Sequence, residues 1–231
     1  MPVQSAAFAR LFSWTGALLF VVSLGYFLVS YLTTFGAVAR EGPAGPAAAW
    51  NVALFTAFAL HHSIFAREPI RRWVARLAAP HLERSFYVWA ASVLFLLVCA
   101  WWRPVPGVAW SAGGTTLWLL RGTQVAALWL ILRSAAILNI WELAGLRPLR
   151  PAEFRTTGPY GWIRHPTYAG WFLLVFAASP MTMTRLVFAV VSGAYLLIAI
   201  PFEERTMRDP PGGAYERYMA RVRWRLVPGV F

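Results

Sequence analysis

Two short clusters of ionisable residues in the last third of the chain could carry chemistry. The first, Arg164-His165-Pro166-Thr167-Tyr168, follows the turn sequence Gly158-Pro159-Tyr160, and the second, Glu203-Glu204, comes after one further apolar run. Ionisable side chains at the edge of a bilayer are costly to keep there, so a cluster of them indicates a functional site. We expect a helical hairpin to bring the two clusters together.

The first cluster has the features of an anion site. Pro166 suits the first turn of a helix, where its missing N–H costs nothing. His165 would then stand at the start of that helix, beside unpaired backbone N–H groups that favour an anion. Together with the guanidinium of Arg164, this helix start could hold a carboxylate.

The other polar residues near these clusters complement such a site. Glu203 or Glu204 could accept hydrogen bonds from a pair of hydroxyls, and we expect only one of them to enter the site, because neighbours on a helix face different ways. Four tyrosines could face an aromatic base or a cation: Tyr160, Tyr168, Tyr215 and Tyr218. This inventory suits a zwitterionic nucleoside such as S-adenosylmethionine, which combines a carboxylate, a ribose diol, an adenine and a sulfonium.

The elements that must position these residues are apolar runs of membrane-spanning length. Hydrophobic residues make up 59% of the 231-residue chain and aromatic residues 16%, which indicates an integral membrane protein anchored at two interfaces. We therefore predict an all-α membrane fold of about six transmembrane helices, the fifth of them short at 14 residues. The runs are Leu11–Phe35, Ala47–Phe65, Phe86–Trp102, Leu117–Ile140, Pro166–Ser179 and Leu186–Phe202.

The arginines predict the orientation of these spans. Sixteen of the 21 basic residues, all of them arginine, fall in one alternating set of connections, and three (Arg40, Arg103 and Arg185) fall in the other. The positive-inside rule then places both termini in the cytoplasm of a multi-pass protein of the cell (inner) membrane. It also places the polar residues of the helix ends at one depth on the cytoplasmic side, among them His61, His62 and Glu142.

Several classes of partner and site are disfavoured by the sequence. A net charge of +12 could suggest nucleic acid, but the arginines lie in loops between apolar runs, so we expect no nucleic-acid binding. The single Cys99 excludes an internal disulfide or a cysteine metal cluster, and we expect no metal site. Two segments, Arg67–Arg84 and Ala214–Trp224, read as interfacial amphipathic helices, so membrane lipid is an expected partner.

The spacing of the motifs over about residues 158–228 resembles the isoprenylcysteine carboxyl methyltransferase and phospholipid methyltransferase superfamily. Its motif parts are Gly158-Pro159-Tyr160, Arg164-His165-Pro166-x-Tyr168-x-Gly170, Glu203-Glu204-Arg205 and Gly213-x-Tyr215-x-x-Tyr218. Further upstream, the chain is similar to the bacterial methanethiol S-methyltransferase branch, although Ile140 and Glu142 stand where that branch carries His and Asp. The similar segments are His62-Ser63-x-x-Ala66-Arg67, Leu82-Glu83-Arg84-Ser85-x-Tyr87, Gly145-Leu146-Arg147 and Ser179-Pro180-Met181-Thr182.

The resemblance implies S-adenosylmethionine as cofactor, bound by the closing hairpin and the tail without a Rossmann domain. Residues 1–231 would form one membrane domain, with a four-helix scaffold in 1–140 and a cofactor-binding loop, helical hairpin and cytoplasmic tail in 141–231. Arg164 and Glu204 are the catalytic candidates, and His62, Arg133, Asn139 and Glu142 the substrate candidates. We expect Arg133 to pair with a carboxylate of the helix bundle. The cofactor candidates are Gly158, Pro159, Tyr160, His165, Pro166, Tyr168, Glu203, Glu204, Tyr215 and Tyr218.

The leading functional hypothesis is methyl transfer from S-adenosylmethionine to a small or lipid-soluble thiol. O-methylation of a prenylcysteine or lipid carboxylate stays open as an alternative. A second alternative is a haem- or metal-binding membrane isomerase of the NnrU type, with His61, His62 and His165 as ligands. A transporter is disfavoured because the charged groups gather at one face and not at the membrane midplane. The oligomeric state is left open.

Overall fold

The computed structural model describes residues 3–65, 67, 70, 72–73, 76, 82–147, 156–208 and 213–231. The chain forms two compact units. The first comprises Met1–Ala37, Ala44–Pro104 and Ile140–Arg150, and the second Val38–Pro43, Val105–Asn139 and Pro151–Phe231. The functional division into 1–140 and 141–231 stays a prediction.

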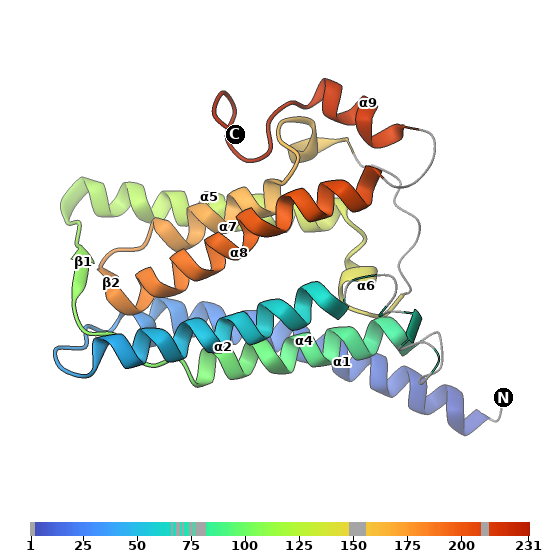
Figure 1. The fold of residues 1–231 in the computed structure, drawn as a ribbon, viewed down its shortest axis with the longest axis horizontal. Helices are drawn as coiled ribbons and strands as arrows, with labels where there is room; N and C mark the ends of the chain where they lie inside the picture. Colours follow the sequence, from blue (N-terminus) through green and yellow to red (C-terminus); the bar gives the residue numbers. More distant parts are fainter. Residues whose placement is uncertain are drawn as a thin grey trace. The chain divides into compact units, whose positions relative to one another are not determined.

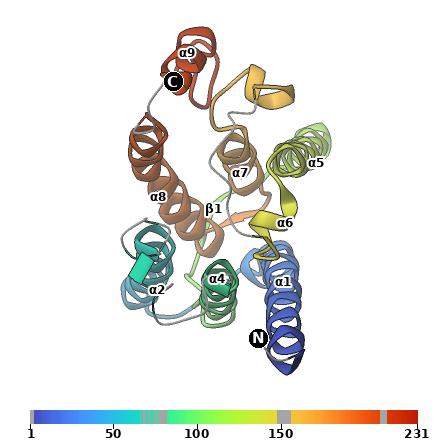
Figure 2. The ribbon, with the colours of Figure 1, turned by 90° about the vertical axis from the view of Figure 1, so that its right-hand side faces the viewer.

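The first unit is built on three long helices, and α4 packs against both α1 and α2 (Figure 2). The approach of α1 to α4 is close, because a Cβ added to Gly16 would lie 2.7 Å from Cδ1 of Trp89. Aromatic rings fill the core, with the ring centroid of Phe27 5.6 Å from those of both Tyr31 and Phe95. The elements of this unit are α1 (Val3–Leu32), η1 (Thr34–Gly36), α2 (Ala44–Phe65), α4 (Glu83–Ala100) and α6 (Ile140–Leu143).

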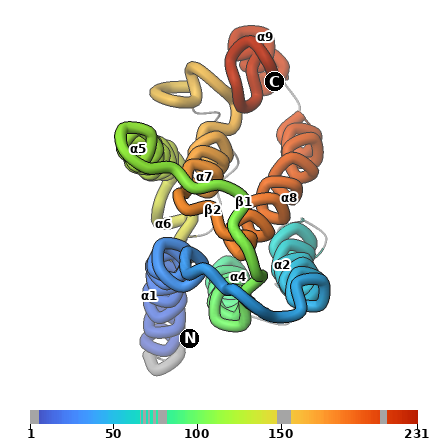
Figure 3. Tube along the Cα trace, turned by 90° about the vertical axis from the view of Figure 1, so that its left-hand side faces the viewer, coloured from blue at the N-terminus to red at the C-terminus, as the bar shows by residue number. Residues whose placement is uncertain are grey.

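The second unit places α7 between α5 and α8 (Figures 1 and 2). Gly170 permits the close contact of α7 with α5, since a Cβ there would lie 2.7 Å from Ile131 and 3.0 Å from the carbonyl oxygen of Ala127. Two short strands, β1 before α5 and β2 between α7 and α8, pair in an antiparallel manner (Figure 3). Val108 lies opposite Thr182. The elements are β1 (Val108–Trp110), α5 (Gly114–Ile137), η3 (Gly158–Gly161), α7 (Pro166–Phe176), β2 (Met181–Thr182), α8 (Met183–Arg208) and α9 (Ala214–Arg221).

Each of the six predicted apolar runs forms a helix, so the expected all-helical class is confirmed. In the described part of the chain, four helices are long and apolar enough to cross a membrane: Ala6–Gly36, Glu83–Ala100, Gly114–Ile137 and Met183–Arg208. This finding makes the chain a multi-pass membrane protein. The helix α2 has 22 residues but carries Asn51 and two histidines, and α7 has only 11 residues, so six spans are not established.

The two predicted amphipathic helices have different outcomes. Most of the predicted segment 67–84 lies outside the described residues. The second is confirmed as a helix, α9, which ends at Arg221 and not at Trp224. The last predicted span is also longer than expected, because α8 continues past Phe202 to Arg208 and holds Glu203 and Glu204 within its final turns.

Candidate functional site

The carboxylate of Glu204 is the centre of a charge cluster in the second unit. Its side chain is 1% exposed, and Oε1 accepts a hydrogen bond of 2.8 Å from Nε of Arg164. The other oxygen, Oε2, accepts two hydrogen bonds from Arg225, one of 3.2 Å from Nε and one of 3.0 Å from Nη2. Buried charges are tolerated when they are paired and hydrogen-bonded, and Glu204 meets both conditions.

Arg164 fastens the C-terminal tail to the start of α7. Its Nη1 donates to the carbonyl oxygens of Val222, at 3.0 Å, and Arg223. The backbone N–H groups of Arg164 and His165 donate to the carbonyls of Trp224 and Arg225, both at 2.9 Å. The segment before α7 and the tail after α9 therefore run side by side, joined by backbone and side-chain hydrogen bonds.

Glu203 has a different environment from Glu204, although the two are adjacent on α8. Its side chain is 45% exposed, and Oε1 accepts a hydrogen bond from the hydroxyl of Tyr168. Successive residues on an α-helix point about 100° apart, which follows from 3.6 residues per turn. The structure thus buries Glu204 within the protein and leaves Glu203 accessible, and the entry of one of the pair into a cofactor site stays a prediction.

His165 is the N-cap residue of α7, and its buried imidazole lies between the two glutamates. Its Nε2 is 3.3 Å from Oε1 of Glu204, its Nδ1 is 3.7 Å from Oε2 of Glu203, and its ring stacks on Tyr168 at 5.4 Å. Burial lowers the pKa of His165, and the nearby Glu204 offsets that effect only in part. The imidazole is therefore neutral at neutral pH.

The turn before the site is shaped by Gly158, whose φ is +58°. This left-handed conformation favours glycine, and a Cβ would also lie 2.8 Å from Cδ1 of Ile137. Pro159 in the same turn is buried, while the partly buried Tyr160 has its pKa raised by burial. The turn is held in place by Tyr218, whose hydroxyl donates to the carbonyl of Tyr160 at 2.8 Å.

Tyr215 and Tyr218 lie in a small core and not at an exposed interface. They are 2% and 6% exposed and pack with Val222, and Met207 and Met219 border the cluster. Burial raises the pKa of Tyr218 to about 12, so the phenol remains protonated. These tyrosines position α9 and the turn at Tyr160, and direct contact of either one with a cofactor stays a prediction.

The predicted substrate residues are divided between the units. His62 on α2 and Glu142 on α6 belong to the first unit, and Arg133 and Asn139 to the second. Nδ1 of His62 is 2.9 Å from the hydroxyl of Tyr87, and Nε of Arg84 donates to the carbonyl of Glu142 at 2.9 Å. Arg133 is exposed and forms no ion pair within the described residues, so the carboxylate partner expected for it is not found.

One member of the charge cluster was not singled out by the sequence analysis. Arg225 was counted only for membrane orientation, yet it donates two hydrogen bonds to Glu204. No periodicity or composition of the tail indicates this pairing, which depends on how residues 222–225 run beside the start of α7. The cluster as a whole combines a half-exposed carboxylate, a neutral imidazole and two partly buried tyrosines, Tyr160 and Tyr168, around a closed ion-pair network. Within the described residues, no group of three or more His, Cys, Asp or Glu side chains is arranged to hold a metal ion.

Comparison with known proteins adds an independent finding. A profile of the isoprenylcysteine carboxyl methyltransferase family matches residues 123–209, which run from α5 to the end of α8. Methanethiol S-methyltransferase 2 of Bradyrhizobium diazoefficiens is 35% identical over 91% of this chain and 89% of its own length. Methanethiol S-methyltransferase of Mycobacterium tuberculosis is also 35% identical, over 89% of this chain and 90% of its own. Nurim of Sus scrofa is 26% identical over 69% of this chain and 68% of its own, and no solved structure matches.

Proposed function

The chain belongs to the isoprenylcysteine carboxyl methyltransferase family, and on that premise we propose that it methylates a small or lipid-soluble thiol. The predicted enzyme class, a methyltransferase that uses S-adenosylmethionine, is confirmed by this membership. The observation that carries the choice of a thiol is the 35% identity to two methanethiol S-methyltransferases, over most of both chains in each case.

The residues of the charge cluster fit S-adenosylmethionine. Bound there, this molecule supplies a methyl group made electrophilic by its sulfonium. Glu203 is the half-exposed carboxylate that would accept hydrogen bonds from its ribose hydroxyls or its ammonium group. The partly buried rings of Tyr160 and Tyr168 offer aromatic surface for the adenine or the sulfonium. The first turn of α7 offers backbone N–H groups to a carboxylate.

Arg164 and Glu204 would act mainly as positioning residues. Because Nε and Nη1 of Arg164 already donate to Glu204 and to the tail, the side chain holds the start of α7, the end of α8 and the tail together. Alignment of acceptor, methyl group and leaving sulfur can supply roughly 7–11 kcal/mol of the barrier. Such alignment requires that the helix ends carrying Tyr168 and Glu203 be held in fixed positions.

The acceptor thiol must react as its thiolate, because the thiolate is the nucleophile. His165 is suited to such a site because its imidazole is neutral and does not repel a cationic donor. The proton of the thiol leaves to solvent or to Nδ1 of His165, which is the ring nitrogen on the side of Glu203.

The membrane arrangement proposed with this function has six spans and both termini in the cytoplasm. Sixteen of the arginines lie in the connections on that side, as the positive-inside rule requires. The 22 residues of α2 are long enough for a span, and α7 would cross as the short member of a hairpin with α8. Cysteine labelling of the loops on either side of the membrane tests this arrangement.

A second candidate is methylation of a prenylcysteine or lipid carboxylate, because the matched profile is that of the carboxyl methyltransferases. The two acceptor classes give products of different chemistry. Detergent-purified protein should be supplied with methyl-labelled S-adenosylmethionine and either a series of alkyl thiols or prenylated cysteines. We expect label in a thioether, which resists mild base. Label found only in a base-labile methyl ester would overturn the thiol proposal and leave the enzyme class intact.

A further inference from the structure

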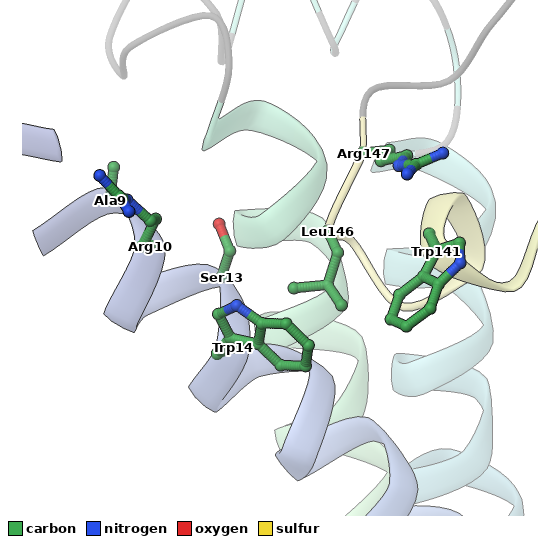
Figure 4. Close-up of a pocket in the computed structure, with 7 residues that line it drawn as sticks. All are labelled: Ala9, Arg10, Ser13, Trp14, Trp141, Leu146 and Arg147. Atoms are coloured by element: carbon green, nitrogen blue, oxygen red, sulfur yellow. The ribbon is translucent and has the colours of Figure 1, made fainter. Parts of the chain in front are cut away.

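The first unit contains a pocket that has no part in the proposed methyl-transfer site. It lies between the N-terminal part of α1 and the segment at and after α6, with a cavity volume of about 480 Å³ (Figure 4). This volume falls within the range of roughly 300–1,000 Å³ usual for ligand pockets. Its lining residues are Ala9, Arg10, Ser13, Trp14, Trp141, Leu146 and Arg147.

Two cations stand at this pocket, one on each wall. Arg10 belongs to α1 and Arg147 follows α6; both are exposed, and neither forms an ion pair within the described residues. Guanidinium groups bind phosphate with bidentate geometry and are only weakly hydrated, so a pair of them without an internal anion favours a phosphate ligand.

The pocket interior is apolar and aromatic. The rings of Trp14 and Trp141 meet edge to face with centroids 6.3 Å apart, and Leu146 points into the same space from the wall of Trp141 (Figure 4). Trp14 follows Arg10 by one helical turn, so the indole lies on the same face of α1 as the guanidinium. A ligand that contacts both must be amphiphilic, and tryptophan is the residue enriched at lipid headgroup level.

The helix α1 also carries exposed apolar side chains along its length. Phe8, Leu11 and Leu18 have between 63% and 65% of their surface exposed, and the helix belongs to the spans that can cross a membrane. Lipid chains would cover these side chains. A ligand that entered from the bilayer would thus reach the two arginines with its headgroup while its chains stayed against α1.

The walls of the pocket are held together by hydrogen bonds. Ser85 of α4 donates from its hydroxyl to the carbonyl of Gly145 at 2.7 Å, and the hydroxyl of Ser13 lies 2.8 Å from that of Ser85. Because the single proton of Ser85 is used, Ser13 is the donor of this pair. The backbone N–H groups of Leu146 and Arg147 both donate to the carbonyl of Trp141, at 2.8 and 3.1 Å, which fixes the loop that carries the second cation.

We propose that this pocket binds the headgroup of an anionic phospholipid, with the phosphate at the rim that carries Arg10 and Arg147 and the upper part of the chains against Trp14 and Trp141. A free phosphate has the same charge but would leave the indoles and the apolar face unused. Each arginine near an anionic headgroup contributes enough to change affinity about fivefold.

The test is a titration of the whole purified protein, in micelles of an uncharged detergent, with phosphatidylglycerol that is fluorescently labelled on its chain. Unlabelled phosphatidylglycerol should compete, whereas phosphatidylcholine and soluble glycerol phosphate should compete poorly. R10Q and R147Q should each weaken binding about fivefold. The matched control is R40Q, because Arg40 is also an exposed arginine but belongs to the second unit, and its loss should leave binding unchanged.

A second variant separates loss of the site from loss of the fold. A9F fills the pocket without a change of charge and should also weaken binding, while the thermal midpoint in detergent reports whether each variant is folded. Equal binding by R10Q, R147Q and R40Q would overturn the proposal, as would equal competition by phosphatidylcholine or by glycerol phosphate. If R147Q instead changed the oligomeric state by light scattering and left lipid binding intact, the pocket would be an interface between copies of the chain and the proposal would fail.

Discussion

In the second unit the carboxylate of Glu204 is 1% exposed and is held by Arg164 and Arg225, whereas in the first unit Arg10 and Arg147 are exposed and have no counterion within the described residues. The first arrangement is closed, since the protein supplies both signs of charge. The second is open, since it supplies only cations. A closed network stabilises the fold and fixes geometry, while an open one is a site for something that the chain does not contain.

The same contrast holds between two neighbours on α8. Glu204 belongs to the closed network, and Glu203, at 45% exposure, has its charge available to a ligand. Substitutions at these paired positions should therefore separate effects on stability from effects on binding.

The largest effect is expected for Glu204→Ala. Removal of one partner of a buried ion pair leaves uncompensated charge, which costs about 3–5 kcal/mol of the free energy of unfolding. The matched control is Glu203→Ala, for which we expect a loss of no more than about 1 kcal/mol because the side chain is half-exposed. Denaturation in detergent, followed by tryptophan fluorescence, measures both. Equal destabilisation by the two variants would show that the network is not closed as described.

The stabilities of the Arg225→Gln and Arg147→Gln variants compare the two units directly. Loss of the charged hydrogen bonds from Arg225 to Glu204 should lower the free energy of unfolding by about 1.5–3 kcal/mol. Arg147→Gln should change it by less than about 0.5 kcal/mol when no anionic lipid is present. The same denaturation assay measures both free energies of unfolding. A destabilised Arg147→Gln protein would mean that this arginine contributes to the stability of the fold.

Glu203→Gln should weaken cofactor binding without loss of stability. A hydrogen bond to a charged group is worth about 1.5–3 kcal/mol, so the dissociation constant of S-adenosylhomocysteine should rise roughly tenfold to a hundredfold. Calorimetric titration measures it, with Glu216→Gln, on the acidic first turn of α9, as the control for a lost surface carboxylate. Unchanged affinity in Glu203→Gln would remove this residue from the cofactor site.

The smallest effect concerns pH. Burial holds the pKa of His165 in the folded state below its ordinary value of about 6.5, which applies to the unfolded state. At a pH between these two pKa values, the unfolded state binds more protons than the folded state. Stability should be constant above pH of about 6.5 and fall as the pH drops below it, by at most about 1.4 kcal/mol per pH unit from this group. His165→Gln should show a shallower fall in thermal midpoint between pH 7 and pH 5. An identical slope in both proteins would contradict the buried neutral imidazole.

The clustering of these charged residues was largely predictable because local connections bring them together. Arg164 and His165 stand at the start of one helix and Glu203 and Glu204 at the end of the next, so a hairpin of α7 and α8 suffices to bring them within hydrogen-bond distance. The tail was harder to place. Arg225 reaches Glu204 only because residues 222–225 run beside the start of α7, and no period or composition indicates that pairing.

The amino-acid sequence by itself determined the helical class, the apolar runs, the methyltransferase motifs and the family, because these depend on composition and on residue spacing along the chain. Tertiary structure alone decided which glutamate is buried, that Tyr215 and Tyr218 form a core, and that Arg133 is exposed without an ion pair among the described residues. The physical reason is that burial and charge pairing depend on which side chains meet across elements. Residues far apart in the chain, such as Arg10 on α1 and Arg147 after α6, therefore come to line one pocket only once these elements are packed.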